Sequence, residues 1–339
     1  MDVNFFKLAE DSLKSWVESR SKVFFPQKEE VLINEGKECE EIYILRRGEL
    51  TVTTSSKTGE EVLLANLSEG SIVGEMSFLE SRAPVATVKV SAGSEVLAIN
   101  KKLLLKVIDA DFVLGRALFH LLAQKLSQQI QDQNALIHTF SGSIIEPLRK
   151  VLTLFSDLEE SDVHWIAKNS FLYRLQPDQI LIRQGEVIRD LFLILAGDVS
   201  VSIQIEEKEK IVGNSTRGEL LGEMSMLSSD YNLTTATVRA LSGVEVIGIN
   251  KKILHDYIHS NSEFGMRFYR GTARMLSQRG RDQLASIGLA SISMKKELRD
   301  DNNVNDVIDF EMLSGITTAG IKFDWLCKEF QNITAKNHI

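Results

Sequence analysis

Three features that would point to particular protein classes are scarce in this chain: cysteine, an excess of positive charge, and long apolar runs. Only two of the 339 residues are cysteines, Cys39 and Cys327. They lie far apart and outside any CxxC pair, so we predict two free thiols rather than a disulfide framework or a zinc site. The net charge of -8 disfavours nucleic acid as a partner.

Signals for a membrane or a secretory location are missing as well. No apolar run approaches the ~20 residues that a membrane-spanning helix needs. The N-terminal segment lacks the cationic start and the apolar middle of a signal peptide. We therefore expect a cytoplasmic protein with no membrane partner.

Motifs of catalysis and metal binding are also absent from the sequence. It contains no Gly-x-Ser-x-Gly elbow, no P-loop and no glycine-rich Rossmann phrase. His255 and His259 lie four residues apart on an expected helix, but no third ligand is near them in the sequence, so we interpret them as surface residues rather than as a metal site. We predict that the protein is not an enzyme, has no catalytic residues and requires no cofactor or metal.

What the sequence does contain is an internal repeat. Gly-Glu-Met-Ser begins at Gly74 and again at Gly222, and each copy is followed by a polar stretch and then by Ala-Thr-Val. The tetrapeptide INKK likewise begins at Ile99 and at Ile249, an offset of 150 residues. A period this long, present only twice, indicates a duplicated domain rather than a solenoid of short repeats.

Each half begins with strand-like segments and ends with a helical one. Runs rich in Val, Ile, Leu and Thr are separated by Gly, Asn or Ser at intervals of roughly ten residues, which is typical of a small antiparallel roll or barrel. After INKK the apolar residues recur at helical spacing, which predicts a long amphipathic helix around Leu114–Ile130 and a weaker copy in the second half. The predicted fold class is α+β: two tandem antiparallel β-roll or barrel domains, each flanked by N- and C-terminal helices.

The pattern divides the chain into three segments. Residues 1–139 form the first domain with its long C-terminal helix, residues 140–294 form the second domain, and residues 295–339 form a polar linker and a short amphipathic helix. The boundary is placed near residues 138–147, where Ser, Gly and Pro interrupt the helical pattern. We expect the last helix to dock on the second roll, with presentation to a partner's groove as the alternative. Its apolar residues are Phe323, Trp325, Leu326, Phe330 and Ile333.

The order of these features resembles that of the cyclic nucleotide-binding domain family: a helix, a roll with glycine turns, the Gly-Glu phrase, the Ala-Thr-Val strand and a long helix. Members of this family include the regulatory subunit of cAMP-dependent protein kinase and the effector domain of the catabolite activator. The resemblance covers roughly residues 10–135 and 155–290. It implies cAMP or cGMP as a possible ligand.

In that family the Gly-Glu phrase is the phosphate-binding cassette. Its glycine opens a short helix whose free N–H groups receive the cyclic phosphate, its glutamate accepts a hydrogen bond from the ribose 2′-hydroxyl, and an arginine just before the Ala-Thr-Val strand pairs with the phosphate. The resemblance implies that a retained ligand would contact one set of residues in each half. These are Gly74, Glu75, Met76, Ser77, Arg82, Ala86 and Thr87 in the first half, and Gly222, Glu223, Met224, Ser225 and Thr237 in the second.

The arginine of the family is missing from both cassettes. Its position in the first half, two residues before Ala86, is held by Pro84, and Arg82 lies two residues earlier still. The second cassette, over residues 225–238, contains no Lys or Arg, is two residues longer and carries Asp230. A charge-assisted pair of this kind contributes roughly 2–4 kcal/mol, so its loss weakens binding about 30- to 1000-fold unless another cation replaces it.

Two functions are open at this point. We favour a non-enzymatic cytoplasmic regulatory protein in which nucleotide binding is weak or lost, protein–protein interaction is the output, and the two cassette glutamates cap their helices from within the fold. The alternative is a functional cAMP or cGMP sensor that binds its ligand in the first domain and signals through the C-terminal helix of that domain. A homodimer through Leu114–Ile130 is also open, because the second domain could cover the same helix instead.

Overall fold

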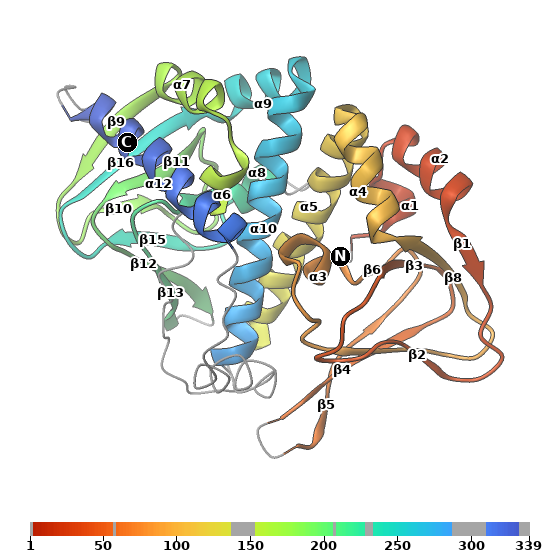
Figure 1. Cartoon of the computed structure of the whole chain (residues 1–339). Helices are drawn as coiled ribbons and strands as arrows, with labels where there is room; N and C mark the ends of the chain where they lie inside the picture. Colours follow the sequence, from red (N-terminus) through yellow and green to blue (C-terminus); the bar gives the residue numbers. More distant parts are fainter. Residues whose placement is uncertain are drawn as a thin grey trace. The chain divides into compact units, whose positions relative to one another are not determined.

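The computed structural model describes residues 3–56, 59–136, 153–205, 208–227, 233–286 and 310–331. The chain divides into two compact units. The first unit comprises Met1–Ser143 and Leu276–Val307, and the second comprises Ile144–Met275 and Ile308–Ile339. The boundary predicted near residues 138–147 lies outside the described residues, as do residues 295–309 of the segment 295–339 in which a polar linker is expected. Figure 1 colours the elements along the chain.

The strands of the first unit form a roll of two four-stranded antiparallel sheets. One sheet has the order β1-β8-β3-β6, with strands Lys22–Phe24, Glu95–Asn100, Glu41–Arg47 and Ile72–Val73. The other has the order β2-β7-β4-β5, with strands Glu30–Ile33, Thr87–Val90, Leu50–Ser55 and Glu61–Leu67. Alternate side chains of both sheets point inward and meet in one apolar cluster, which holds the sheets face to face. The cluster contains Ile33, Leu45, Leu50, Val73, Val88, Val90 and Val96.

Five helices accompany this first roll along the chain: α1 (Phe5–Leu8), α2 (Asp11–Arg20), α3 (Glu75–Glu80), α4 (Lys101–Ala110) and α5 (Phe112–Leu136). Helix α4 begins directly after β8 because the Asn100 side chain accepts hydrogen bonds from the first backbone N–H groups of the helix. Helix α5 contains the stripe predicted from the sequence. All of its apolar members are buried: Leu114, Leu118, Leu121, Leu122, Leu126 and Ile130.

The second unit repeats the same plan. Its sheets have the orders β10-β15-β12-β13 and β14-β11-β16-β9. The strands are β9 (Ser170–Leu175), β10 (Ile180–Ile182), β11 (Asp190–Ala196), β12 (Val199–Ile205), β13 (Lys208–Ser215), β14 (Leu220–Leu221), β15 (Thr237–Ala240) and β16 (Val244–Asn250). The helices are α6 (Thr153–Asp157), α7 (Glu160–Lys168), α8 (Glu223–Leu227), α9 (Lys251–Ser260), α12 (Phe310–Phe330) and the part of α10 (Ser262–Ser286) up to Met275, because the residues from Leu276 on group with the first unit. The predicted α+β class with two tandem antiparallel rolls is therefore confirmed.

Helix α12 packs inside the second unit against α6 and α7. The Phe323 ring meets the edge of Phe155 with ring centroids 5.0 Å apart, and the Arg217 guanidinium lies 4.9 Å from the Phe323 centroid. Leu326 and Phe330 are buried. These contacts place the apolar face of the C-terminal helix on the second unit.

The length of α12 depends on this packing. The helix has 21 residues, although a short one was expected, and it contains Gly315 and Gly320. Each glycine lowers the helix propensity by about 1 kcal/mol relative to alanine, so tertiary contacts must stabilise the helix. Trp325 lies against the His164 ring, with centroids 4.0 Å apart. Ile333 lies outside the described residues.

Among the residues that the structure describes, no helix combines the length and the apolarity that crossing a bilayer requires.

Candidate ligand-binding cassettes

Each cassette begins with a glycine that the backbone requires. Gly74 precedes α3 with a φ of 91°, and a Cβ there would lie 3.0 Å from the Glu41 carbonyl oxygen. Gly222 precedes α8 with a φ of 85°, and a Cβ there would lie 2.5 Å from the Ile188 side chain. Residues with a Cβ rarely adopt this backbone region, so glycine makes both turns possible.

A serine and a lysine hold each cassette helix against its roll. Ser77 donates a hydrogen bond to the Gly74 carbonyl oxygen at 3.0 Å, and Lys101 Nζ donates to Ser77 Oγ at 2.7 Å and to the Cys39 carbonyl oxygen at 2.6 Å. The second unit has the same pattern of bonds. Ser225 donates to the Gly222 carbonyl oxygen at 2.9 Å, and Lys251 Nζ donates to Ser225 Oγ at 2.6 Å. The INKK repeat therefore supplies a partly buried lysine to each cassette, a role that was not predicted from the sequence.

Burial changes the acid–base behaviour of these lysines. It lowers the pKa of Lys101, although the Cys39 and Glu75 side chains oppose the shift. It lowers the pKa of Lys251 from its ordinary 10.5 to about 8, against the attraction of Glu223 and Asp190. A folded-state pKa below that of the unfolded chain means that the unfolded chain binds more protons between these two values.

The free energy of unfolding should therefore contain a term from Lys251 that increases as the pH rises from about 8 to about 10.5. We expect Lys251→Met to lose this term, so that the stability of the wild type relative to the variant increases with pH across that window. Urea denaturation at several pH values measures the difference. Lys252→Met is the matched control, because Lys252 is exposed; a difference that does not change with pH would contradict the assignment.

Glu75, the residue that corresponds to the ribose acceptor, is buried and already has a partner. Its side chain is 5% exposed, and Lys125 of α5 donates a hydrogen bond to its carboxylate. The interpretation of this glutamate as a helix cap is therefore wrong, because its carboxylate pairs with an ammonium rather than with backbone N–H groups. The Phe78 ring of α3 also stacks on Phe119 of α5, with centroids 6.3 Å apart. The first cassette is thus joined to α5 by one ion pair and one ring contact.

The lysine that pairs with Glu75 is not repeated in the second half. Helices α5 and α10 have the same length of 25 residues at an offset of 150, so Lys125 corresponds to Met275. Glu223 is 3% exposed, like Glu75. The sequence contains no signal for the Lys125 contact, because the pair joins residues 50 positions apart and occurs in one half only.

The positions that correspond to the family's arginine are held by uncharged residues. Pro84 and Thr234 each stand two residues before the alanine of Ala-Thr-Val. Their carbonyl oxygens accept hydrogen bonds from the backbone N–H groups of Gly36 and Gly185, both at 2.9 Å. Further along, Thr87 and Thr237 begin β7 and β15 beside the same turns. Asp230 lies outside the described residues.

Arg82, the arginine of the first cassette, lies beside a neighbouring carboxylate. Its Nη1 lies 3.7 Å from Glu80 Oε2. The same carboxylate oxygen accepts a hydrogen bond from Arg281 Nε at 2.9 Å, in the segment that groups with the first unit. Met76 and Ala86 are partly buried, as is Met224, whose sulfur lies 3.8 Å from the hydroxyl of Thr235. The structure thus brings Gly74, Glu75 and Ser77 together with two lysines and leaves Arg82 paired with Glu80.

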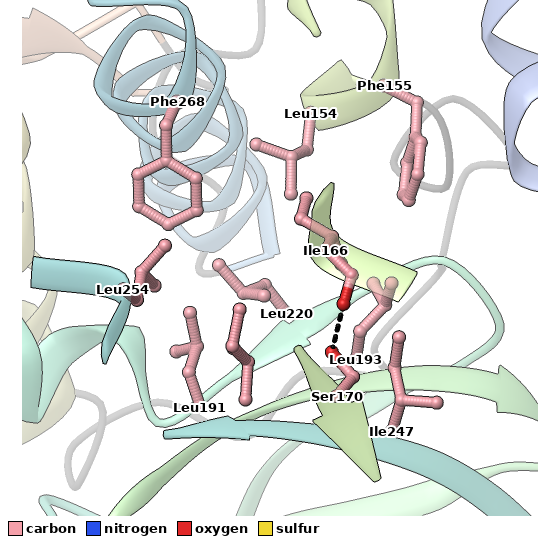
Figure 2. Close-up of a pocket in the computed structure, with 11 residues that line it drawn as sticks. Leu154, Phe155, Ile166, Ser170, Leu191, Leu193, Leu220, Ile247, Leu254 and Phe268 are labelled. Atoms are coloured by element: carbon pink, nitrogen blue, oxygen red, sulfur yellow. Dashed lines mark hydrogen bonds between the residues drawn. The ribbon is translucent and has the colours of Figure 1, made fainter. Parts of the chain in front are cut away.

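A small apolar cavity in the second unit is separate from the cassette (Figure 2). It lies between α6, α7, α9, α10 and one face of the sheet β14-β11-β16-β9. Leu191 and Leu193 line it, whereas Phe192 and Ile194, which alternate with them along β11, belong to the core of the roll. Its volume is about 20 Å³, enough for one water molecule at most. Figure 2 also shows the hydrogen bond of 2.7 Å from Ser170 Oγ to the Ile166 carbonyl oxygen.

No cluster of three or more potential metal ligands occurs among the described residues. The rings of His255 and His259 lie with centroids 4.0 Å apart, and His259 Nδ1 is 2.8 Å from the carbonyl oxygen of His255.

Comparisons with known proteins agree with this geometry. The family model for the cyclic nucleotide-binding domain matches residues 24–111 and 172–261. The cGMP-dependent protein kinase egl-4 of Caenorhabditis briggsae is 25% identical over 223 residues, which are 65% of this chain and 26% of the kinase. The cAMP-activated global transcriptional regulator CRP of Salmonella typhimurium is 30% identical over 115 residues, which are 34% of this chain and 54% of CRP.

Among solved structures, the regulatory domain of Toxoplasma gondii PKA with cAMP covers 82% of this chain, which in turn covers 92% of that domain. The sequence identity is 15% and the TM-score is 0.32. The chain spans only about a quarter to a half of the length of the two curated relatives. Because the family model matches more than half of the chain, in two tandem regions, the protein belongs to the cyclic nucleotide-binding domain family.

Proposed function

We propose that this chain is a non-enzymatic regulatory protein whose two cyclic nucleotide-binding domains bind cyclic nucleotides weakly or not at all. Contact with another protein is its output, and its location is cytoplasmic. One observation carries the proposal: Pro84 and Thr234 occupy the two positions of the phosphate-binding arginine. Neither side chain carries the positive charge that would pair with a phosphate.

The state of Glu75 supports the same proposal. A ribose hydroxyl would have to share the Glu75 carboxylate with the Lys125 ammonium, which already donates to Oε1 in the buried site. A nucleotide would have to displace the ammonium or share the carboxylate with it. Breaking a buried ion pair is costly, so the contact disfavours ligand entry.

We place the partner surface outside the stripe Leu114–Ile130. Its apolar residues are buried within the single chain, which disfavours a homodimer through this stripe. The net charge of -8 disfavours nucleic acid. A protein partner is the remaining class, and cyclic nucleotide-binding domains are regulatory rather than catalytic modules, which supports a role without enzymatic activity.

The sensor remains a second candidate because two cations lie at the first cassette. Lys101 and Lys125 both interact with Glu75. A cyclic phosphate could attract Lys125 away from Glu75. Because Lys125 belongs to α5, the loss of this pair would change how the first cassette contacts α5. In that case Lys125→Met would abolish nucleotide binding.

Thermal unfolding of the full chain with cAMP or cGMP separates the two functions. A ligand at 100 times its dissociation constant adds about 2.7 kcal/mol of stability. We expect almost no shift of the melting temperature with either nucleotide at about 100 μM, because a ligand at or below its dissociation constant adds at most about 0.4 kcal/mol of stability. A shift of several degrees at micromolar nucleotide that is lost in Glu75→Ala would instead establish the sensor.

A further inference from the structure

One arginine of the second unit contacts two successive residues of α12. Phe323 is 2% exposed, and its ring meets the ring of Phe155 in α6 with centroids 5.0 Å apart. The Arg217 guanidinium lies 4.9 Å from the Phe323 centroid and donates a hydrogen bond to the carboxylate of Asp324 at 2.5 Å. A guanidinium stabilises both an aromatic face and a carboxylate. Arg217 and Phe155 together therefore recognise an aromatic residue that is followed by an acidic one.

Further contacts with α6 and α7 complete the surface under α12, which lies beside these helices in Figure 1. Lys322 Nζ donates hydrogen bonds to the carbonyl oxygens of Phe155 and Leu158. Trp325 lies against the His164 ring of α7, with centroids 4.0 Å apart. We call this surface the α12 site and define it by Phe155, Leu158, His164 and Arg217.

The helices that form the α12 site are fixed by contacts in which α12 takes no part. In α6, the buried Asp157 accepts hydrogen bonds from Arg270 Nε at 2.6 Å and from Arg274 Nη1 at 2.8 Å. In α7, Asp162 accepts from Arg267 Nε at 2.7 Å. All three arginines belong to α10. We therefore expect α6 and α7 to keep their places when α12 leaves, so that the site is preorganised for a helix.

Helix α12 depends on this site more than the site depends on the helix. Gly315 and Gly320 lower its intrinsic helix propensity. Its ion pair with Arg217 is solvent-exposed, with side chains 48% and 60% exposed, so water screens it. The helix also lies outside residues 24–111 and 172–261, which match the family model. It is thus an addition to the family fold, and another helix of the same chemistry can take its place.

The first roll provides an internal comparison for Arg217. At the offset of 148 that relates Gly74 to Gly222, the position of Arg217 is held by Glu69. The aromatic residue is kept, since Phe155 corresponds to Phe6 at an offset of 149. The charge that attracts a carboxylate is therefore reversed in the first roll, and the preference for an acidic helix belongs to the second roll.

We propose that the α12 site is the partner-binding surface of this protein: it takes an amphipathic helix of another protein that presents an aromatic residue followed by a carboxylate, in place of α12. Helix α12 is then a competitor within the chain, and it leaves the site when the partner helix binds. The inference rests on the proposed function, in which contact with another protein is the output, and it names the surface and the kind of partner.

The test uses a fluorescein-labelled peptide of residues 310–331 as the probe and measures its fluorescence anisotropy with the full chain. Replacing Phe323 and Leu326, both buried, by alanine in the chain weakens the internal competitor. We expect this double variant to bind the peptide at least about tenfold tighter than the unmodified chain does, because its site is free in a larger fraction of molecules.

Variant peptides test the recognition of the aromatic residue and of the carboxylate. We expect a Phe323→Ala peptide to bind the double variant at least about tenfold more weakly than the parent peptide. An Ile321→Ala peptide is the matched control and should bind within about twofold, because Ile321 is 65% exposed. Adding Arg217→Glu to the double variant should weaken the parent peptide at least about threefold, and an Asp324→Arg peptide should recover part of this loss.

Equal affinities of the unmodified chain and the folded double variant for the peptide would overturn the proposal, as would a Phe323→Ala peptide that binds like the parent. Circular dichroism establishes that each variant is folded. If the double variant fails to fold, the Asp324→Arg chain decides, because this residue is exposed: it must bind the parent peptide at least about threefold tighter than the unmodified chain. Tight cAMP binding by the unmodified chain would refute the proposed loss of nucleotide binding, and the peptide result would still decide the role of the α12 site.

Discussion

Replacing Arg267 with methionine is expected to lower the free energy of unfolding of the second unit by about 3–5 kcal/mol. Arg267 Nε and Nη2 donate to the two oxygens of Asp162 at 2.7 and 3.0 Å. The Asp162 side chain is only 2% exposed, and the arginine 10%. Without the guanidinium the carboxylate would be buried and unpaired, which is among the most destabilising changes a single substitution can make.

The Asp162 carboxylate also helps to cap the N-terminus of α7. Asp162 Oδ2 accepts a hydrogen bond from the Glu159 backbone N–H at 2.8 Å, as half of the capping box of α7. Urea denaturation followed by circular dichroism measures the loss. Arg174→Met is the matched control, because Arg174 pairs with Glu245 at 2.7 Å but both side chains are at least 40% exposed, so its loss should cost about 1 kcal/mol or less. Similar losses for the two variants would show that burial of the Asp162 pair does not determine its contribution to stability.

Lys125→Met is expected to lower the stability of the first unit by about 3 kcal/mol, because it leaves Glu75 buried without its closest cation. This loss of stability should be at the low end of the range for breaking a buried ion pair, since Lys101 also attracts Glu75. Adding Glu75→Gln to the variant removes the charge and should recover part of the stability. Chemical denaturation of the two variants and the wild type measures both steps.

An exposed lysine serves as the control for Lys125. Lys89 pairs with Glu61 at 2.6 Å, but the two side chains are 26% and 55% exposed. We expect Lys89→Met to leave the stability nearly unchanged, because water screens an exposed ion pair. If Lys125→Met were as mild as Lys89→Met, the Glu75 carboxylate could not be held as the structure indicates, and it would then be available to a ribose.

The duplicated rolls could be predicted from the sequence because their signals are local. Glycine at Gly74 and Gly222 marks turns that only positive φ allows, and the strand and helix periods follow directly from which faces are buried. The repeat of INKK also indicates a structural role for its first lysine in both halves. Its lysines are kept in both halves because each one holds the serine of its cassette helix.

The partner of Glu75 could not be predicted in the same way. Lys125 and Glu75 lie 50 positions apart, which is not the spacing of a helix or a turn. In the sequence, the missing arginine is the main visible obstacle to a phosphate. The structure adds that Glu75 is buried and paired with Lys125, in the half to which the sensor hypothesis assigns the ligand.

The most direct test of the central claim is a calorimetric titration of the full chain with cAMP and with cGMP. Without a guanidinium at the family's arginine position in either cassette, we expect dissociation constants weaker than about 100 μM for both nucleotides. A dissociation constant of about 1 μM or tighter for either nucleotide would contradict the claim that these cassettes no longer bind cyclic nucleotides effectively.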